Sequence, residues 1–149
     1  MNFKITKLEI ENFRSIQEKV TLNIKSGLFS IEGINYTETN STNGSGKSTL
    51  ISALFWALTG SSLTNEVLAD EVVNLKVNKN CRVSVYITTD KDEIKVTRVR
   101  KDTEHGNNLF LDINGQDLSC HKVADTQDRI NKLIDNAYEL YDAIDNGEI

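Results

Sequence analysis

Hydrophobic and polar residues alternate along much of the chain, and this pattern predicts a fold rich in β-strands. The clearest run is 81–88, in which four apolar residues alternate with polar ones. A period of two places successive side chains on opposite faces of a strand. The opening strand has a phase slip near Lys7. Further strands are predicted over 3–10, 20–24, 28–31, 94–100 and 109–113.

Two segments have the spacing of helices instead. Leu50, Leu54 and Leu58, with Ile51 and Phe55, predict the apolar face of a helix over 46–58. Gly60 follows where a glycine commonly ends a helix. A second helix is predicted over 126–134, with a further helical turn over 138–144.

The order of these elements predicts a mixed α/β (α+β) fold in a single domain. Turn signals at 90–92, 104–107 and 114–115 separate the later strands, so that these form an antiparallel meander. We expect a phosphate-loop core over 1–60, a β lobe over 61–122 and a helical, acidic segment over 123–149. A chain of 149 residues suits one such unit.

Composition narrows the functional classes. The net charge of −5 gives no overall support for nucleic-acid binding, although residues 76–101 carry eight basic and three acidic side chains. The chain has neither a run of transmembrane length nor a secretory signal, so we expect a cytoplasmic protein without a membrane partner. Cys81 and Cys120 lie far apart and outside any zinc spacing, and Cys81 is predicted to be a small core residue.

The strongest chemical signal is the run NGSGKST, which places Asn43, Gly44, Ser45, Gly46, Lys47, Ser48 and Thr49 directly before the apolar helix. Glycines allow consecutive backbone N–H groups to face one anion, and the start of a helix adds its positive dipole end. Lys47 would contact the β- and γ-phosphates of a nucleotide, and the Ser48 hydroxyl would bind Mg²⁺.

The phosphate-loop pattern is incomplete at one position. The first glycine of G-x-x-x-x-G-K-[ST] is replaced by Ser41, and the polar segment 34–42 is an insertion after Gly33. The alternative is a surface loop that contains Gly-Lys-Ser by chance. A predicted strand precedes the loop and a predicted helix follows it, which favours phosphate binding.

Several stretches together resemble the N-terminal ATPase lobe of SbcC-type proteins. Residues 8–16 (LEIENFRSI) are similar to the opening of that family, and 43–49 to its phosphate loop. Weaker similarities lie in the predicted strands, at 82–85, 95–98 and 112–115. The family includes relatives of the structural-maintenance-of-chromosomes (SMC) ATPases and the large subunits of phage recombination exonucleases.

The resemblance implies a role in DNA repair or recombination, with ATP and Mg²⁺ bound by residues 43–49. It also implies that Arg14 and Ser15 lie near the nucleotide, whereas the alternative for Arg14 is a solvated arginine after a strand. In this family a second lobe supplies the Walker B carboxylates and the signature motif. The implied partners are therefore a C-terminal ATPase lobe or second head and an SbcD-type nuclease subunit, with DNA as a further candidate.

The second lobe is not evident in this sequence, so we expect an ATP-binding half that is inactive alone. Residues 67–71 imitate a Walker B motif, and 58–61 imitate a signature motif. We interpret both as coincidences, the second as a helix end. Asn146 stands where the family often has the glutamine of Gln-Gly-Glu. No catalytic base is assigned.

Other functions remain open. Arg98 and Arg100 share one face of a strand, and with Arg82 they could form a row that holds DNA phosphates. The alternative is an exposed face kept soluble by charge. The chain could also be a non-enzymatic binding or regulatory protein that docks onto an ATPase or nuclease complex. A GTPase is disfavoured because 78–81 lacks the aspartate that recognises guanine, and a P-loop kinase stays open.

Overall fold

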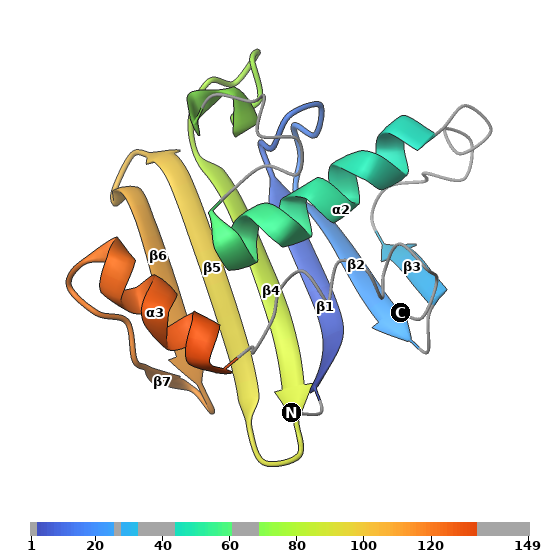
Figure 1. The fold of residues 1–149 in the computed structure, drawn as a ribbon. Helices are drawn as coiled ribbons and strands as arrows, with labels where there is room; N and C mark the ends of the chain where they lie inside the picture. The colour runs from blue at the N-terminus through green and yellow to red at the C-terminus, as the bar shows by residue number, and fades with distance from the viewer. Residues whose placement is uncertain (1–2, 26–27, 33–43, 61–68, 134–149) are drawn as a thin grey trace.

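The computed structural model describes residues 3–25, 28–32, 44–60 and 69–133 (Figure 1). The strands are β1 (Phe3–Glu11), β2 (Val20–Lys25), β3 (Leu28–Glu32), β4 (Cys81–Thr89), β5 (Glu93–Asp102), β6 (Gly106–Ile113) and β7 (Gln116–Asp117). The helices are α2 (Gly44–Thr59), the 3-10 helix η1 (Ala69–Val72) and α3 (Val123–Leu133). The predicted mixed α/β fold with an antiparallel β region is confirmed.

The seven strands that the structure describes form one antiparallel sheet in the order β3-β2-β1-β4-β5-β6-β7. The strands of the predicted phosphate-loop core and β lobe meet where β1 pairs with β4. The phase slip near Lys7 is confirmed, because the register of this pair shifts between Ile5 and Lys7. The shift lets apolar side chains face the same side on either part of β1.

The hydrophobic core lies between the sheet and α2, which crosses the strands on the face that also carries α3 (Figure 1). Leu8, Val83, Val85 and Leu109 point from the sheet toward this side and are fully buried. In α2, all nine residues from Leu50 to Leu58 are buried, so the helix is enclosed on every side and not only on the predicted face.

The two helices differ in how they are buried. In α3, Thr126 and Ile130 are buried, whereas most of its other residues are exposed. This pattern is that of an amphipathic helix lying on the surface of the sheet, where it contacts β6. None of the helices that the structure describes has the length and apolar character needed to cross a lipid bilayer.

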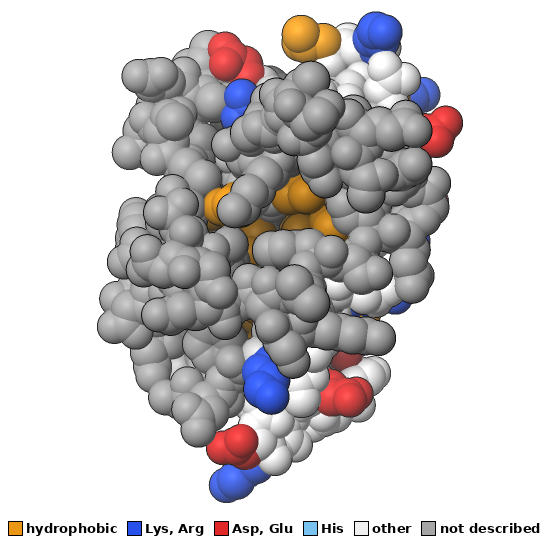
Figure 2. Space-filling view, turned by 90° about the vertical axis from the view of Figure 1, so that its right-hand side faces the viewer, with side chains coloured by type: hydrophobic (Ala, Val, Ile, Leu, Met, Phe, Trp, Pro, Cys, Tyr) orange, Lys and Arg blue, Asp and Glu red, His pale blue; other side chains and the backbone are white. Residues whose placement is uncertain are grey.

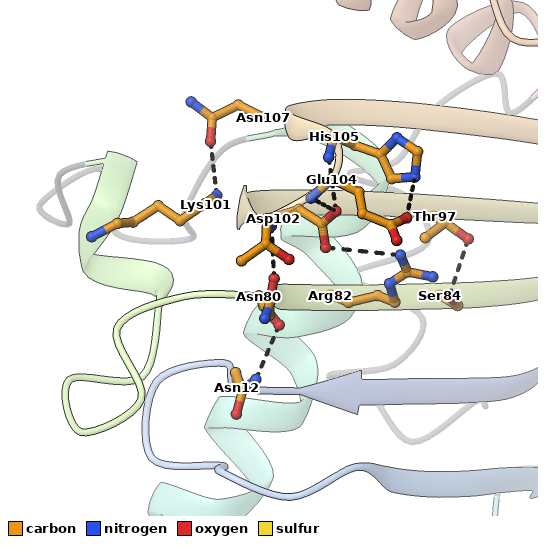
Figure 3. Close-up of polar contacts among 11 residues, drawn as sticks. Asn12, Asn80, Arg82, Ser84, Thr97, Lys101, Asp102, Glu104, His105 and Asn107 are labelled. Atoms are coloured by element: carbon orange, nitrogen blue, oxygen red, sulfur yellow. Dashed lines mark hydrogen bonds and ion pairs between the residues drawn. The ribbon is translucent and has the colours of Figure 1, made fainter.

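The sheet face turned away from α2, here called the polar face, carries hydrophilic side chains. The Tyr86 hydroxyl donates to Glu9 Oε1 at 2.5 Å, and the Ser84 and Thr97 hydroxyls are 3.0 Å apart. Burial and the hydrogen bond to Glu9 raise the pKa of Tyr86 to about 12, so its hydroxyl remains a donor. Figure 3 shows Ser84 and Thr97 on the side of the strands opposite the ribbon of α2.

Candidate functional site

Helix α2 begins at Gly44, so the predicted phosphate loop forms its first turns. The first N–H groups of a helix have no partners within it, and together with the helix dipole they favour an anion. The predicted helix is present and begins at Gly44, two residues earlier than the predicted start at 46. Asn43 lies outside the described residues, as do the side chains of 44–48, among them Lys47 and Ser48.

A second element of the site is the turn after β1 that carries Arg14 and Ser15. Asn12 and Arg14 have left-handed backbone conformations, with φ of 53° and 50°. Such values are uncommon for residues other than glycine and persist only where surrounding contacts enforce them.

Those contacts come from the segment around η1 and from α2. The Arg14 amide donates to the Val72 carbonyl at 2.7 Å. Phe13 forms a β-bridge with Val73, and its ring, 1% exposed, lies 5.6 Å from the ring of Trp56. The turn is thus held against the phosphate-loop helix.

Asn74 secures this turn with every polar group that it has. Its Nδ2 donates to the Arg14 carbonyl at 2.7 Å, and its backbone N–H donates to the Asn12 carbonyl at 2.9 Å. Its Oδ1 accepts from the amides of Lys76 and Val77, and its own carbonyl accepts from the Asn78 amide. The side chain is 4% exposed. Asn74 therefore shapes two segments at once, the Arg14 turn and residues 74–78.

These elements line an open pocket of about 790 Å³, a volume typical of small-molecule sites. Its lining comprises Arg14, Ser15, Gln17, Thr49, Glu71, Val73, Asn74, Leu75 and Lys76. The pocket brings Arg14 and Ser15 together with Thr49, the last residue of the predicted phosphate loop. Figure 2 views the side on which α2 begins and shows hydrophobic side chains set back near the centre of that face.

The sequence did not predict the remaining lining residues as part of a site. They are Gln17, Glu71, Val73, Asn74, Leu75 and Lys76. Segment 62–75 lacks a clear period, so no element was assigned to it. A local signal was present nonetheless, because Asn74 directly follows the apolar pair Val72–Val73. Asparagine in this setting is typical of a side-chain-to-backbone turn.

The two imitation motifs behave as the sequence analysis expected. Asp70 and Glu71 lie in the 3-10 helix η1 and not at the end of a buried strand, as a Walker B pair would. Helix α2 ends at Thr59, and Gly60 follows with a φ of 79° while its amide donates to the Trp56 carbonyl at 2.7 Å. Residues 58–60 are therefore the end of a helix, and Ser61 lies outside the described residues.

The prediction that Arg82 joins Arg98 and Arg100 in one row is wrong. Arg98 stands opposite Val83 and faces α2, whereas Arg82 stands opposite Val99 and lies on the polar face. Arg98 is 8% exposed, and Arg82 lies 3.9 Å from Asp102 (Figure 3). The strand register separates these cations, so Arg82 and the pair of Arg98 and Arg100 cannot contact one nucleic-acid backbone together.

A smaller cavity of about 460 Å³ lies on the polar face, beside Arg82. The charged part of its lining consists of Glu9, Glu11, Asp102 and Glu104 with Lys19, Arg82 and Lys95. Carboxylates outnumber cations there, and the cavity is on the other side of the sheet from α2. The 790 Å³ pocket is therefore the better candidate for a phosphate-bearing ligand.

Cys81 is a core residue, as the sequence predicted. Cys81 is buried and unpaired, and burial raises the pKa of its thiol to about 12, as suits a core residue. Among the described residues, no group of three or more His, Cys, Asp or Glu side chains could hold a metal ion.

Comparison with known proteins places the chain in a family. A model of the AAA domain matches residues 7–146. No curated protein matches significantly. Matching solved structures include the SMC head domain from Thermotoga maritima, with 20% sequence identity and a TM-score of 0.47 over 85% of this chain. The chain spans 41% of the length of that structure, so the properties of a whole head domain do not transfer to it.

Replacing Asn74 with alanine should lower the free energy of unfolding by about 2–4 kcal/mol, because each buried group left without a hydrogen bond costs about 1–3 kcal/mol. Urea denaturation followed by circular dichroism measures this loss. Asn107→Ala is the matched control, since the exposed Asn107 accepts one hydrogen bond from the Lys101 amide at 2.9 Å. Equal losses in the two variants would show that Asn74 does not secure the turn.

Proposed function

The chain belongs to the AAA domain family, and from this premise we propose that it is the ATP-binding lobe of an SbcC-type ATPase. The observation that carries the proposal is the pocket in which Arg14 and Ser15 meet the first turns of α2. A helix N-terminus, an arginine and two hydroxyl-bearing residues are a suitable set for a nucleoside triphosphate.

The nucleotide's phosphates would lie at the start of α2. The free backbone amides at the start of α2 and the Lys47 ammonium would bind them, and the Ser48 hydroxyl would be the protein's ligand to Mg²⁺. Bound Mg²⁺ would neutralise charge on the phosphates. Arg14, exposed at the rim of the pocket, would add a further cation. Among the described residues, the pocket joins Arg14 and Ser15 with Thr49, and this supports the proposal.

Leu75, in another part of the pocket lining, suits the base. Leu75 lines the pocket and is 87% exposed, which leaves its apolar surface free to pack on a planar ring. Asn74 fixes the backbone around it by accepting hydrogen bonds from Lys76 and Val77. Leu75 therefore projects from a rigid turn, and the cost of ordering it on binding is small.

Hydrolysis would need more than this lobe. Phosphoryl transfer requires a metal, a phosphate-binding lysine and a group that positions the attacking water. The phosphate loop would supply a ligand for the metal and the lysine, and we assign no residue to the third requirement. We infer that a C-terminal lobe or a second head completes the site. We further propose that the protein acts in DNA repair or recombination and that an SbcD-type nuclease subunit is its partner.

The direct test is calorimetric titration of the chain with ATP and with GTP in the presence of Mg²⁺. ATP should bind in preference to GTP, and Lys47→Ala should weaken ATP binding by about tenfold or more, because a charged hydrogen bond is worth about 1.5–3 kcal/mol. Lys91→Ala, in the exposed β4–β5 turn, is the control. Absence of binding by the unaltered chain would favour a non-enzymatic docking protein instead, and steady ATP turnover by the pure chain would refute the need for a second lobe.

The proposed contact between Leu75 and the base can be tested separately. Leu75→Ser should weaken Mg-ATP binding about fivefold to thirtyfold, since covering one leucine contributes about 1–2 kcal/mol, and should leave binding of inorganic triphosphate unchanged. Calorimetry with both ligands measures the difference. Val123→Ser removes another partly exposed apolar side chain, on α3, and should change neither affinity. Parallel losses for ATP and triphosphate would place the base elsewhere.

A further inference from the structure

Arg98 is a buried cation on the core-facing side of β5. Its Nε donates to the Ala57 carbonyl at 3.2 Å, and its guanidinium lies over the Trp56 ring with Cζ 6.0 Å from the centroid. A second N–H of the guanidinium donates to Gln127 Oε1. Burial lowers the pKa of Arg98 to about 10, so the group stays charged at neutral pH. Burying a charge is costly unless its contacts replace the lost water, so these contacts define what the residue does.

Gln127, on α3, also contacts the C-terminal end of α2. Its Nε2 donates to the Leu58 carbonyl at 2.7 Å and to Asn131 Oδ1 at 3.0 Å. Ala57 and Leu58 are in the last turn of α2, where carbonyls have no partner within the helix. Side chains from β5 and α3 therefore satisfy the C-terminal end of α2.

The charge of Arg98 suits this place. The last turn of α2 contains no basic residue of its own, whereas the negative end of the helix dipole favours a cation there. Gly60 leaves room for the guanidinium, because a Cβ atom at that position would lie 3.1 Å from an Arg98 nitrogen. With a φ of 79°, Gly60 also turns the chain away from the helix beside Arg98.

We propose that Arg98 and Gln127 are positioning residues that clamp the C-terminal end of α2 and thereby couple α3 to the nucleotide site at its other end. The coupling rests on the proposed function. Helix α2 has 16 residues and spans about 24 Å, and its enclosed packing makes it a stiff connection. A shift of the clamped end therefore displaces the first turn, where the phosphates bind.

Coupling of this kind is reciprocal. If docking of α3 through Gln127 favours the position of α2 that binds ATP, then bound ATP must favour docked α3 by the same free energy. Purely structural support predicts no such link. A variant that only destabilises the fold would leave the affinity of the folded protein unchanged.

The experiment uses the full chain with Gln127→Ala and the matched control Arg129→Ala. Arg129 is on the same helix and donates to the Leu118 carbonyl at 3.0 Å, so the control removes a similar contact that does not reach α2. Calorimetry should show Mg-ATP bound about fivefold or more weakly by Gln127→Ala, at the low end of allosteric couplings, and equally well by Arg129→Ala. Arg98→Lys keeps the charge but not the planar set of donors, and should weaken binding in the same direction.

Hydrogen exchange distinguishes the coupling from a simple change in stability. Mg-ATP should slow amide exchange across α3 in the unaltered chain and in Arg129→Ala, and this slowing should be lost in Gln127→Ala. If Gln127→Ala binds Mg-ATP as tightly as the unaltered chain and α3 is still protected, the coupling is refuted while the nucleotide site stands. If the unaltered chain binds no Mg-ATP, the proposed function fails and the coupling fails with it.

Discussion

Nine consecutive residues of α2, from Leu50 to Leu58, are buried, and the position of this helix constrains every other part of the site. Burial of that much apolar surface is the main favourable term in folding, so the helix cannot move far from the sheet without a large loss of stability. The site inherits this constraint because the phosphate loop forms the first turns of the same helix. The packing of the neighbouring residues along the chain would therefore make the proposed anion site rigid.

Polar contacts then complete the two ends of the region. Near the start of α2, Asn74 holds the strained Arg14 turn by hydrogen bonds to the Arg14 and Asn12 carbonyls. At the far end, Arg98 and Gln127 satisfy the Ala57 and Leu58 carbonyls. In both places a buried polar side chain comes from a different element, so sheet, helix and turn are fixed relative to one another.

The elements of this fold were predictable because their patterns are local. Alternation defines β4 and β5, and the four-residue spacing of Leu50, Leu54 and Leu58 defines α2. The phosphate loop could be predicted because its chemistry needs residues that are adjacent in the chain. What failed depended on contacts between distant segments: Asn74 acts on Arg14, 60 residues away, and Arg98 acts on the end of α2.

The error at Arg98 has a particular physical cause. The parity of β5 already placed Arg98 with Ile94 and Val96, the apolar side of the strand. Its charge was nevertheless taken as a sign of exposure, since arginine is seldom buried. The structure resolves the conflict by giving the guanidinium a carbonyl, an amide oxygen and an aromatic ring. The position of Arg98 in the strand alternation predicted its burial better than its residue type did.

The most direct test of this account is to map the amide resonances of the isotope-labelled chain during titration with Mg-ATP. If the nucleotide binds between α2 and the Asn74 turn, the largest shifts should fall on 44–49, on Arg14 and Ser15, and on 74–76. Shifts confined to the polar face around Arg82 and Thr103, with none at the start of α2, would contradict it.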